Sequence, residues 1–335
     1  MVKESRGVLY NQGEELKIAT VPLKQELAAD EVLVNIHSAI LNPIDQLFII
    51  GLPLGKTLPT FVGFEGSGIV RAAGSGQRAQ SLLNQRVAIF AGNDLQALGS
   101  WGEYTIIKES QVHLLPAEVD FEQGATAVVN PFTAQGLFNQ IRNAGHKSFI
   151  NGAASSTVGK FLVSLAKKHG LKVTCLVRKE EYVQGLRDLG ADEVLNTSKE
   201  GFRDQLAAAI TKHGITAFLD PVAGSEGSSL VPLLPAGSLT IIYGAMNQEP
   251  YTLHPGDILF NQKTVTGFQL NKTVSDPKVG PHVIQDGLEN LKDGTLRTVI
   301  AKKFELEQFA DALKYSKENA ASSGKVILFN KNFTA

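Results

Sequence analysis

The stretch "SFINGAASSTVGKFLVSLAKKHGLKVTCLVRKEE", residues 148–181, decides the fold of this chain. A short apolar strand leads through small residues into an amphipathic helix at 156–169, and a second apolar strand, "KVTCLV", follows. This order of strand, turn, helix and strand is typical of the unit that binds dinucleotides. At such a turn the free backbone N–H groups and the helix dipole both point at a bound phosphate. The stretch therefore predicts a nucleotide site at the start of the helix.

The turn lacks two of the three glycines of the usual G-x-G-x-x-G pattern. Ala154 and Ser156 replace the first two, and Gly159, which lets the helix pack closely on the strand, is kept. Small residues at a tight turn also occur for packing alone, so a purely structural turn is the alternative. The predicted cofactor contacts of the turn are Ala154, Ser155, Ser156, Thr157, Val158 and Gly159.

Arg178 and Lys179 stand directly after the second strand, where versions of the unit that bind NAD carry an acid. A carboxylate there bonds the ribose 2′-hydroxyl, whereas a guanidinium can bind a 2′-phosphate through paired, charge-assisted hydrogen bonds. The alternative is a solvated basic pair at a strand end. Together with the turn, the two basic residues predict NADPH rather than NADH as the cofactor.

The rest of the chain extends this pattern. After the second strand, helices predicted at 179–189, 199–213 and 225–233 alternate with the apolar strands "EVLN", "AFLD" and "SLTIIYG". Five strands with crossover helices indicate a doubly wound parallel sheet. Short β patterns separated by glycine fill the first 125 residues, and "KVILFN" near the end is a further strand. The predicted α/β fold has a β-rich domain at 1–125 and 264–335, and a nucleotide-binding domain at 126–263.

Composition narrows the classes of partner. The 335 residues include 32 basic and 33 acidic ones, so the net charge of −1 gives no general attraction to nucleic acid or to an anionic membrane. No apolar run approaches the roughly 20 residues of a membrane span. The first residues alternate like a strand and resemble no targeting segment, which predicts a cytoplasmic protein. Cys175 is the one cysteine, so no intrachain disulfide forms, and its apolar strand predicts a small core residue.

Several motifs in order give the chain a family resemblance. They include "SAILNPIDQLFIIG" (38–51), "PTFVGFEGSGIV" (59–70), "NPFTAQGLF" (130–138), "DPVAG" (220–224) and "GKVILF" (324–329). With these motifs the chain resembles the medium-chain dehydrogenases/reductases, in the zinc-independent branch of quinone oxidoreductases and enoyl reductases. The resemblance implies a GroES-like catalytic domain, a Rossmann domain, a cofactor in the cleft between them, and a homodimer formed through the edges of the Rossmann sheets, with "SLTIIYG" near such an edge.

Zinc-dependent enzymes of this superfamily need a cysteine in the first motif and a histidine before the glutamate of the second. This chain has Ser38 to Leu41 in the first region and Phe64 before Glu65. A catalytic zinc site takes three converging side-chain ligands and an open fourth position. The resemblance therefore implies an enzyme without a metal.

The resemblance also assigns roles to single residues. Asn42 and Asp45 would line the active cleft near the nicotinamide, although an Asn-Pro turn and a helix cap are the structural alternatives. Two histidines, His37 and His254, have no carboxylate partner in the sequence and receive no catalytic role. The further cofactor contacts implied are Thr133, Gly244, Ala245, Met246, Phe268 and Leu270 for the nicotinamide half, Val222 and Ala223 for the adenosine side, and Lys325 from the last strand.

Hydride transfer from NADPH to a quinone or another conjugated carbonyl compound, a small hydrophobic substrate, is the reaction that the resemblance favours. Enoyl thioester (enoyl-CoA or enoyl-ACP) reductases look similar but carry a tyrosine that donates or orients a proton. At that position this chain has Leu52 or Pro53. A protein that binds NADPH without turnover, as crystallins of this family do, is the alternative of another class.

Overall fold

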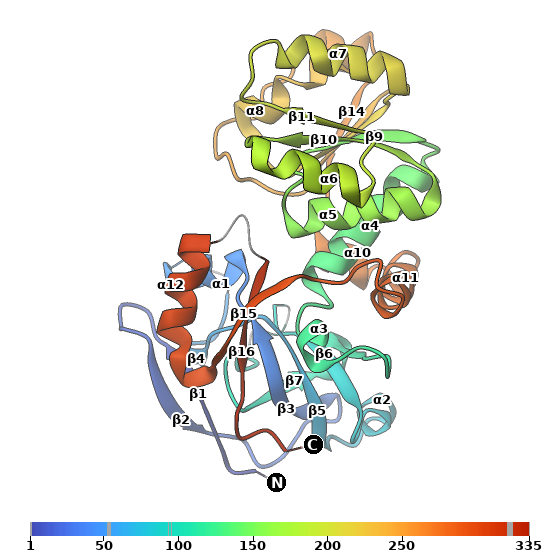
Figure 1. The fold of residues 1–335 in the computed structure, drawn as a ribbon. Helices are drawn as coiled ribbons and strands as arrows, with labels where there is room; N and C mark the ends of the chain where they lie inside the picture. Colours follow the sequence, from blue (N-terminus) through green and yellow to red (C-terminus); the bar gives the residue numbers. More distant parts are fainter. Residues whose placement is uncertain (1, 52–54, 93, 95, 320–323, 335) are drawn as a thin grey trace. The chain divides into compact units, whose positions relative to one another are not determined.

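The computed structural model describes residues 2–51, 55–92, 94, 96–319 and 324–334. The chain divides into two compact units (Figure 1). The first unit holds Met1–Val129 and Arg297–Ala335, and the second unit holds Asn130–Leu296. None of the described helices is long and apolar enough to cross a membrane.

The first unit is built from two β-sheets. The smaller has the strand order β2-β1-β4, and the larger has the order β15-β16-β3-β5-β6-β8 with β7 paired to β3. The strands are β1 (Glu4–Tyr10), β2 (Lys17–Pro22), β3 (Glu31–Ile40), β4 (Thr60–Phe61), β5 (Glu65–Ala73), β6 (Arg86–Phe90), β7 (Tyr104–Lys108), β8 (Val112–Leu114), β15 (Ile300–Glu305) and β16 (Lys325–Phe329). All neighbouring strands run antiparallel except β15 and β16. The β-rich domain assembled from both chain ends is therefore confirmed.

Short helices α1 (Pro43–Ile49), α2 (Gln77–Ser81) and α3 (Phe121–Gly124), together with α12 (Phe309–Asn319), complete this unit. Trp101 is fully buried in its core, and the indole N–H donates to the Ile40 carbonyl at 3.1 Å. The sole tryptophan therefore reports on the folding of the first unit.

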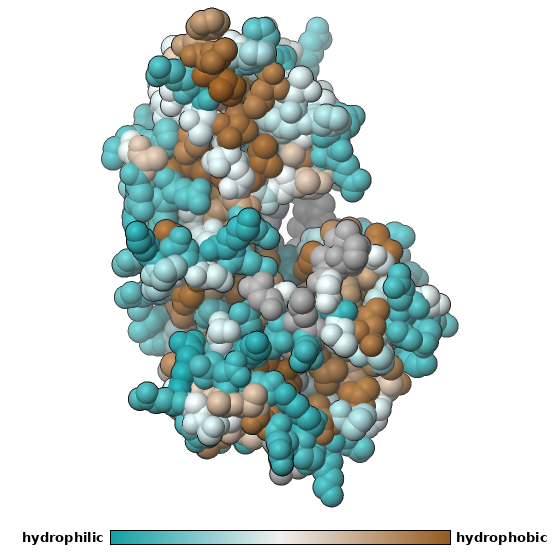
Figure 2. Space-filling model, turned by 180° about the vertical axis from the view of Figure 1, so that it is seen from behind, coloured by the Kyte–Doolittle hydropathy of each residue, from teal (hydrophilic) through white to brown (hydrophobic). Residues whose placement is uncertain are grey.

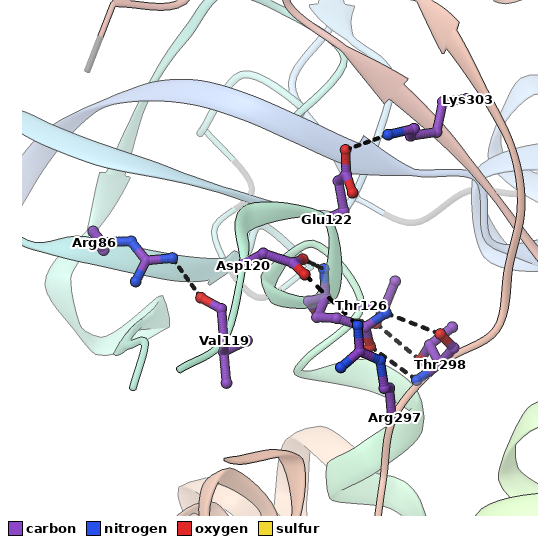
Figure 3. Close-up of polar contacts among 9 residues, drawn as sticks. Arg86, Val119, Asp120, Glu122, Thr126, Arg297, Thr298 and Lys303 are labelled. Atoms are coloured by element: carbon purple, nitrogen blue, oxygen red, sulfur yellow. Dashed lines mark hydrogen bonds and ion pairs between the residues drawn. The ribbon is translucent and has the colours of Figure 1, made fainter. Parts of the chain in front are cut away.

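Figure 3 shows how the returning chain is held against α3. The Gln123 amide donates to the Thr298 carbonyl at 2.9 Å and accepts from the Thr298 N–H at 2.9 Å, as a neighbouring strand would. The hydroxyls of Thr126 and Thr298 are 2.9 Å apart, and Lys303 pairs with Glu122 at 2.7 Å. These contacts fix the point at which the chain re-enters the first unit.

The second unit holds a six-stranded parallel sheet with the order β11-β10-β9-β12-β13-β14. Its strands are β9 (Ser148–Asn151), β10 (Lys172–Val177), β11 (Glu193–Asn196), β12 (Ala217–Asp220), β13 (Leu239–Ile242) and β14 (Thr264–Gly267). Numbered within the unit, this is the order 3-2-1-4-5-6 of the Rossmann fold. The predicted doubly wound sheet is confirmed.

Helices cover both faces of this sheet (Figure 1). One apolar core joins the sheet to α4 (Val129–Asn143), α5 (Thr157–His169) and α6 (Val183–Leu189). A second core joins the opposite face to α7 (Phe202–His213). The remaining helices are α8 (Gly224–Ser228), α9 (Pro255–Leu259), α10 (Leu270–Ser275) and α11 (Gly280–Lys292).

The structure corrects three predictions about this unit. The second unit extends to Leu296 rather than ending near 263, because β14 pairs with β13 and so belongs to its sheet. For the same reason "SLTIIYG" is not at the edge: β13 lies between β12 and β14. The single helix expected at 225–233 is α8 followed by a 3₁₀ turn at Val231–Leu233, where Pro232 interrupts helical hydrogen bonding.

Candidate functional site

The strand order of the second unit reverses between β9 and β12, the two strands at its centre. In open parallel sheets, ligands bind beyond the carboxyl ends of the strands at this switch point. Residues predicted to contact the cofactor follow these ends: the turn 154–159 follows β9, Arg178 follows β10, and Val222 follows β12. The topology therefore brings three separately predicted segments to one edge of the sheet.

The turn after β9 is closed by its own hydrogen bonds. Ser156 is the N-cap of α5, and its hydroxyl oxygen accepts the Gly159 N–H at 3.1 Å. The Ala154 N–H donates to the Leu176 carbonyl of β10 at 2.9 Å. A Cβ on Gly159 would lie 2.6 Å from Ala154 Cα, so the position accepts only glycine without a backbone shift. The two replaced glycines are tolerated, and the retained one is required by packing.

Two alanines at the switch point have backbone angles that non-glycine residues rarely adopt. Ala153, just after β9, has φ 42°, and Ala223, just after β12, has φ 59°. Positive φ at alanine costs conformational energy and occurs at functional sites when surrounding contacts enforce it. The strain therefore marks the same edge as the motifs do. Because alanine is not a residue type that indicates positive φ, the sequence did not predict this strain.

Asp220, the last residue of β12, is a site residue that the sequence reasoning missed. Its carboxylate is fully buried, and Oδ1 accepts the N–H groups of Val222 and Ala223, each at 2.9 Å. Burial raises the pKa of this carboxyl, against those two hydrogen bonds. Asp220 therefore holds the strained segment in place. The "D" of "DPVAG" was the available signal.

Arg178 is exposed at the carboxyl end of β10, and its carbonyl accepts the Ser198 hydroxyl at 3.0 Å. A hollow of about 240 Å³ opens between the start of α5 and the start of α6. Ser155, Lys160 and Tyr182 are among the residues that line it. The following acids have partners of their own, since Glu180 pairs with Lys199 at 2.8 Å and Glu181 with Lys179 at 3.5 Å.

The residues predicted to contact the nicotinamide half differ in their exposure and packing. Gly244 approaches Pro221 so closely that a Cβ would lie 2.5 Å from its carbonyl oxygen, and Ala245 and Met246 beyond it are exposed. Phe268, in contrast, packs its ring against Gly136 of α4, which favours the core alternative. Leu270 begins α10, and Thr133 lies partly buried in the first turns of α4.

In the first unit, Asn42 and Asp45, which were predicted to line the active cleft, are both buried. Asn42 is 2% exposed and Asp45 is 0% exposed. Asp45 accepts the Asn42 N–H at 2.6 Å through Oδ2 and the Phe64 N–H at 3.0 Å through Oδ1. Burial raises the pKa of the Asp45 carboxyl to about 7, against these two hydrogen bonds. Asp45 thus caps α1, as the structural alternative held.

Glu65 and Lys325 complete a buried polar network around Asn42. The Asn42 amide donates to Glu65 Oε2 at 2.8 Å, and its oxygen accepts from Lys325 Nζ at 3.0 Å. The other oxygen, Glu65 Oε1, accepts the N–H groups of Val128 and Val129 at 2.7 and 2.9 Å. Burial raises the pKa of Glu65 and lowers the pKa of Lys325. The Lys325 amine is used within the network, so its predicted contact with the cofactor stays a prediction.

These residues do not fit a catalytic zinc ion. Both oxygens of Glu65 already accept hydrogen bonds, and the Phe64 side chain that precedes it offers no ligand atom. Ser38, in the first region, is fully buried in β3. Across the described residues, no group of three or more His, Cys, Asp or Glu side chains is arranged to hold a metal.

Three further side chains, those of Cys175, His37 and His254, pack or form hydrogen bonds within the fold. Cys175 is fully buried, and burial raises the pKa of its thiol to about 12, which confirms it as a core residue. The His37 ring stacks on Phe121 with centroids 4.7 Å apart. His254 caps α9 by accepting the Gly256 N–H. The Leu52 or Pro53 position, where enoyl thioester reductases carry tyrosine, lies outside the described residues.

Comparison with known proteins agrees with this architecture. Residues 28–117 match the family model of the alcohol dehydrogenase GroES-like domain, and residues 157–291 match that of the zinc-binding dehydrogenases. Mitochondrial enoyl-[acyl-carrier-protein] reductase of Caenorhabditis elegans is 29% identical over 314 residues, which cover 90% of this chain and 88% of the relative. Quinone oxidoreductase of Rattus norvegicus is 26% identical over 331 residues, 98% of each chain.

A candidate NADPH:quinone reductase of Mesorhizobium loti, known from its crystal structure, superposes with a TM-score of 0.86. It is 28% identical and is matched over 98% of this chain and 99% of its own. The GroES-like model matches residues of the first unit, and the dehydrogenase model matches residues of the second unit. The relatives are matched along most of their length. The chain belongs to the medium-chain dehydrogenase/reductase superfamily of oxidoreductases, with quinone oxidoreductases and mitochondrial enoyl-ACP reductases among its homologues.

Proposed function

We propose that this protein is a zinc-independent reductase that uses NADPH to reduce a quinone or another conjugated carbonyl compound. The observation that carries the cofactor choice is Arg178, an exposed guanidinium directly after β10 where NAD-binding versions place an acid. The nearest acids along the chain, Glu180 and Glu181, are neutralised by lysines. A 2′-phosphate there would meet the positive charge of Arg178, while Lys179 offsets Glu181.

Bound NADPH would supply the hydride, and the protein would supply binding and orientation. In this proposal the turn 154–159 and the N-terminus of α5 hold the pyrophosphate, and Val222 and Ala223 flank the adenosine side. Thr133 and the backbone at 244–246 contact the nicotinamide half. The strained φ angles of Ala153 and Ala223 support the placement of the dinucleotide at this edge.

The acceptor class is supported by the exposed apolar side chains at the end of α1. Leu47 and Ile50, at the end of α1, are 42% and 79% exposed, and such side chains suit an apolar acceptor. The enoyl thioester alternative has the Caenorhabditis elegans relative in its support, although a quinone oxidoreductase reaches the same 29% identity, and it is opposed by the absence of tyrosine at position 52 or 53. Turnover of quinones, enones and enoyl thioesters under identical conditions separates the two.

The cofactor proposal is tested by the substitution Arg178→Asp. The wild type should bind NADPH at least tenfold more tightly than NADH, and the variant should reverse this order, because a carboxylate repels a 2′-phosphate and accepts a 2′-hydroxyl. Titration of both cofactors by calorimetry measures the effect, with Arg187→Asp on α6 as a control substitution of the same type. An unchanged preference in Arg178→Asp would mean that the phosphate is bound elsewhere.

We also propose a homodimer formed through β14. In the described part of the chain, β14 pairs on one side only, and α9 beside it exposes Ile258, Leu259 and the following Phe260, which is 86% exposed. Figure 2 shows apolar side chains gathered on this unit. An open strand edge of this kind can pair with the same edge of a second copy of the chain. Phe260→Asp should halve the mass in sedimentation, whereas Leu114→Asp in the first unit should not. The predicted cytoplasmic location stays a prediction.

A further inference from the structure

We infer that Glu65 is a positioning residue for the proposed reaction: it fixes the first turn of α4 and, through it, the side chain of Thr133. Glu65 belongs to β5, far from α4 in the sequence, and is 0% exposed. Its Oε1 accepts the N–H groups of Val128 and Val129 at 2.7 and 2.9 Å. Val129 is the first residue of α4. A carboxylate from another segment thus serves as the cap of this helix.

The local sequence of α4 explains why a distant cap is needed. The first N–H groups of a helix have no partner within it and are usually satisfied by a Ser, Thr, Asp or Asn side chain at the N-cap. Here the helix starts with "AVVNPF", and neither Val128 nor Val129 has a side chain that accepts a hydrogen bond. Glu65 supplies both the acceptor and a negative charge at the positive end of the helix dipole.

The carboxylate itself is held from its other side. Glu65 Oε2 accepts the Asn42 amide at 2.8 Å, and the oxygen of that amide accepts from Lys325 Nζ at 3.0 Å. A rotation of the Asn42 amide would place its NH₂ group against the lysine ammonium, so the donor side stays turned toward Glu65. The cap therefore has one orientation, set by a chain of buried hydrogen bonds.

The cap at Val129 also orders the backbone that carries Thr133, because both residues lie near the start of α4. It lies four residues after Val129, one turn further along α4 and on the same face of the helix. An unsatisfied first turn frays, and a frayed turn would release the backbone that orients Thr133. This step rests on the proposed function, because Thr133 is proposed to contact the nicotinamide half. The capping of α4 does not rest on it.

The substitution Glu65→Gln tests the inference. A glutamine that turns its NH₂ group toward α4 opposes the two N–H groups of Val128 and Val129, and one that turns it toward Asn42 opposes the NH₂ group of that amide and also lacks the negative charge at the start of the helix. Asp94→Asn is the matched control. Asp94 is also buried and accepts three backbone N–H groups, those of Gln96, Ala97 and Lys108, none of which belongs to α4.

Two readouts are compared at a temperature where both variants are folded. Amide hydrogen exchange over residues 128–134 should accelerate at least tenfold in Glu65→Gln relative to Asp94→Asn. The KM for NADPH should rise at least fivefold in Glu65→Gln while Asp94→Asn stays within twofold of the wild type. If Glu65→Gln does not fold, Glu65→Asp keeps the charge and draws the carboxylate back from α4, and the same comparison applies.

Equal exchange rates over 128–134 in the two variants would overturn the inference, because Glu65 would then contribute only general stability. Faster exchange without a change in KM would overturn the part that concerns Thr133. A wild type whose reaction requires neither NADPH nor NADH would instead refute the proposed function. The exchange comparison would then still decide whether Glu65 fixes α4, so the two failures are distinguishable.

Discussion

Asp45 should make the first unit less stable as the pH rises through neutrality, and Asp45→Asn should remove this dependence. The carboxyl is fully buried, and burial raises its pKa from 3.8 to about 7. A carboxyl with a raised pKa in the folded state contributes stability that is fully present below the unfolded value and is lost as the pH rises through the folded value. From these two pKa values the loss between pH 5 and pH 8 is about 2.6 kcal/mol.

Asparagine at this position cannot ionise, and it offers one oxygen to the two N–H groups that Asp45 now satisfies, those of Asn42 and Phe64. The unsatisfied donor costs about 1–3 kcal/mol at every pH. Asp45→Asn should therefore be less stable than the wild type at pH 5. The difference should shrink by about 2.6 kcal/mol by pH 8, where the wild type pays for a buried charge.

The assay is urea unfolding followed by the fluorescence of Trp101, which is buried in the first unit. Subtracting the variant from the wild type at each pH removes the ionisations that the two proteins share and leaves the titration of Asp45 together with its coupling to Glu65 and Lys325. A difference that stays constant from pH 5 to pH 8 would refute the reasoning. It would mean that Asp45 is ionised throughout and that its two hydrogen bonds outweigh burial.

Two further predictions concern the second unit. Gly159→Ala should destabilise this unit by about 2 kcal/mol or more, because the new Cβ would lie 2.6 Å from backbone atoms of Ala154. Gly185→Ala in α6 meets no atom within 4 Å and should stabilise the unit by about 0.5–1 kcal/mol. Circular dichroism during urea unfolding measures both changes, and equal effects would contradict the packing argument. Cys175 is buried, and its thiol pKa is raised to about 12. It should therefore react with a disulfide reagent at pH 8 only after unfolding. A rapid reaction of the native protein would show that the strand opens locally.

Periodicity and turn residues were enough to predict most strands and the parallel sheet. The strand β14 was missed because its four residues, "TVTG", carry one apolar side chain and are largely exposed, so they show neither a buried run nor alternation. The predicted boundary near 264 lay too early because β14, and with it α10 and α11, belongs to the second unit. Short edge strands are specified by their neighbours more than by their own sequence.

The candidate site was predictable where one segment makes it. Gly159 and Arg178 depend on the local order of strand, turn and helix, and the structure places Gly159 in the first turn of α5 and Arg178 directly after β10. The roles of Asn42 and Glu65 depend on partners from other segments, Lys325 and Val128, which no local pattern reveals. The strain at Ala223 likewise arises from the carboxylate of Asp220.

The position of β16 after the second unit in the chain has a consequence for synthesis on the ribosome. Residues 130–296 form a continuous stretch, so the second unit has all its strands while translation is still in progress. The first unit does not, because β3 pairs with β16 and the amine of Lys325 donates to the buried Asn42 amide. The strands that precede the second unit should therefore reach their native state after it, and the edge of β3 that later meets β16 stays open until then, which exposes it to aggregation.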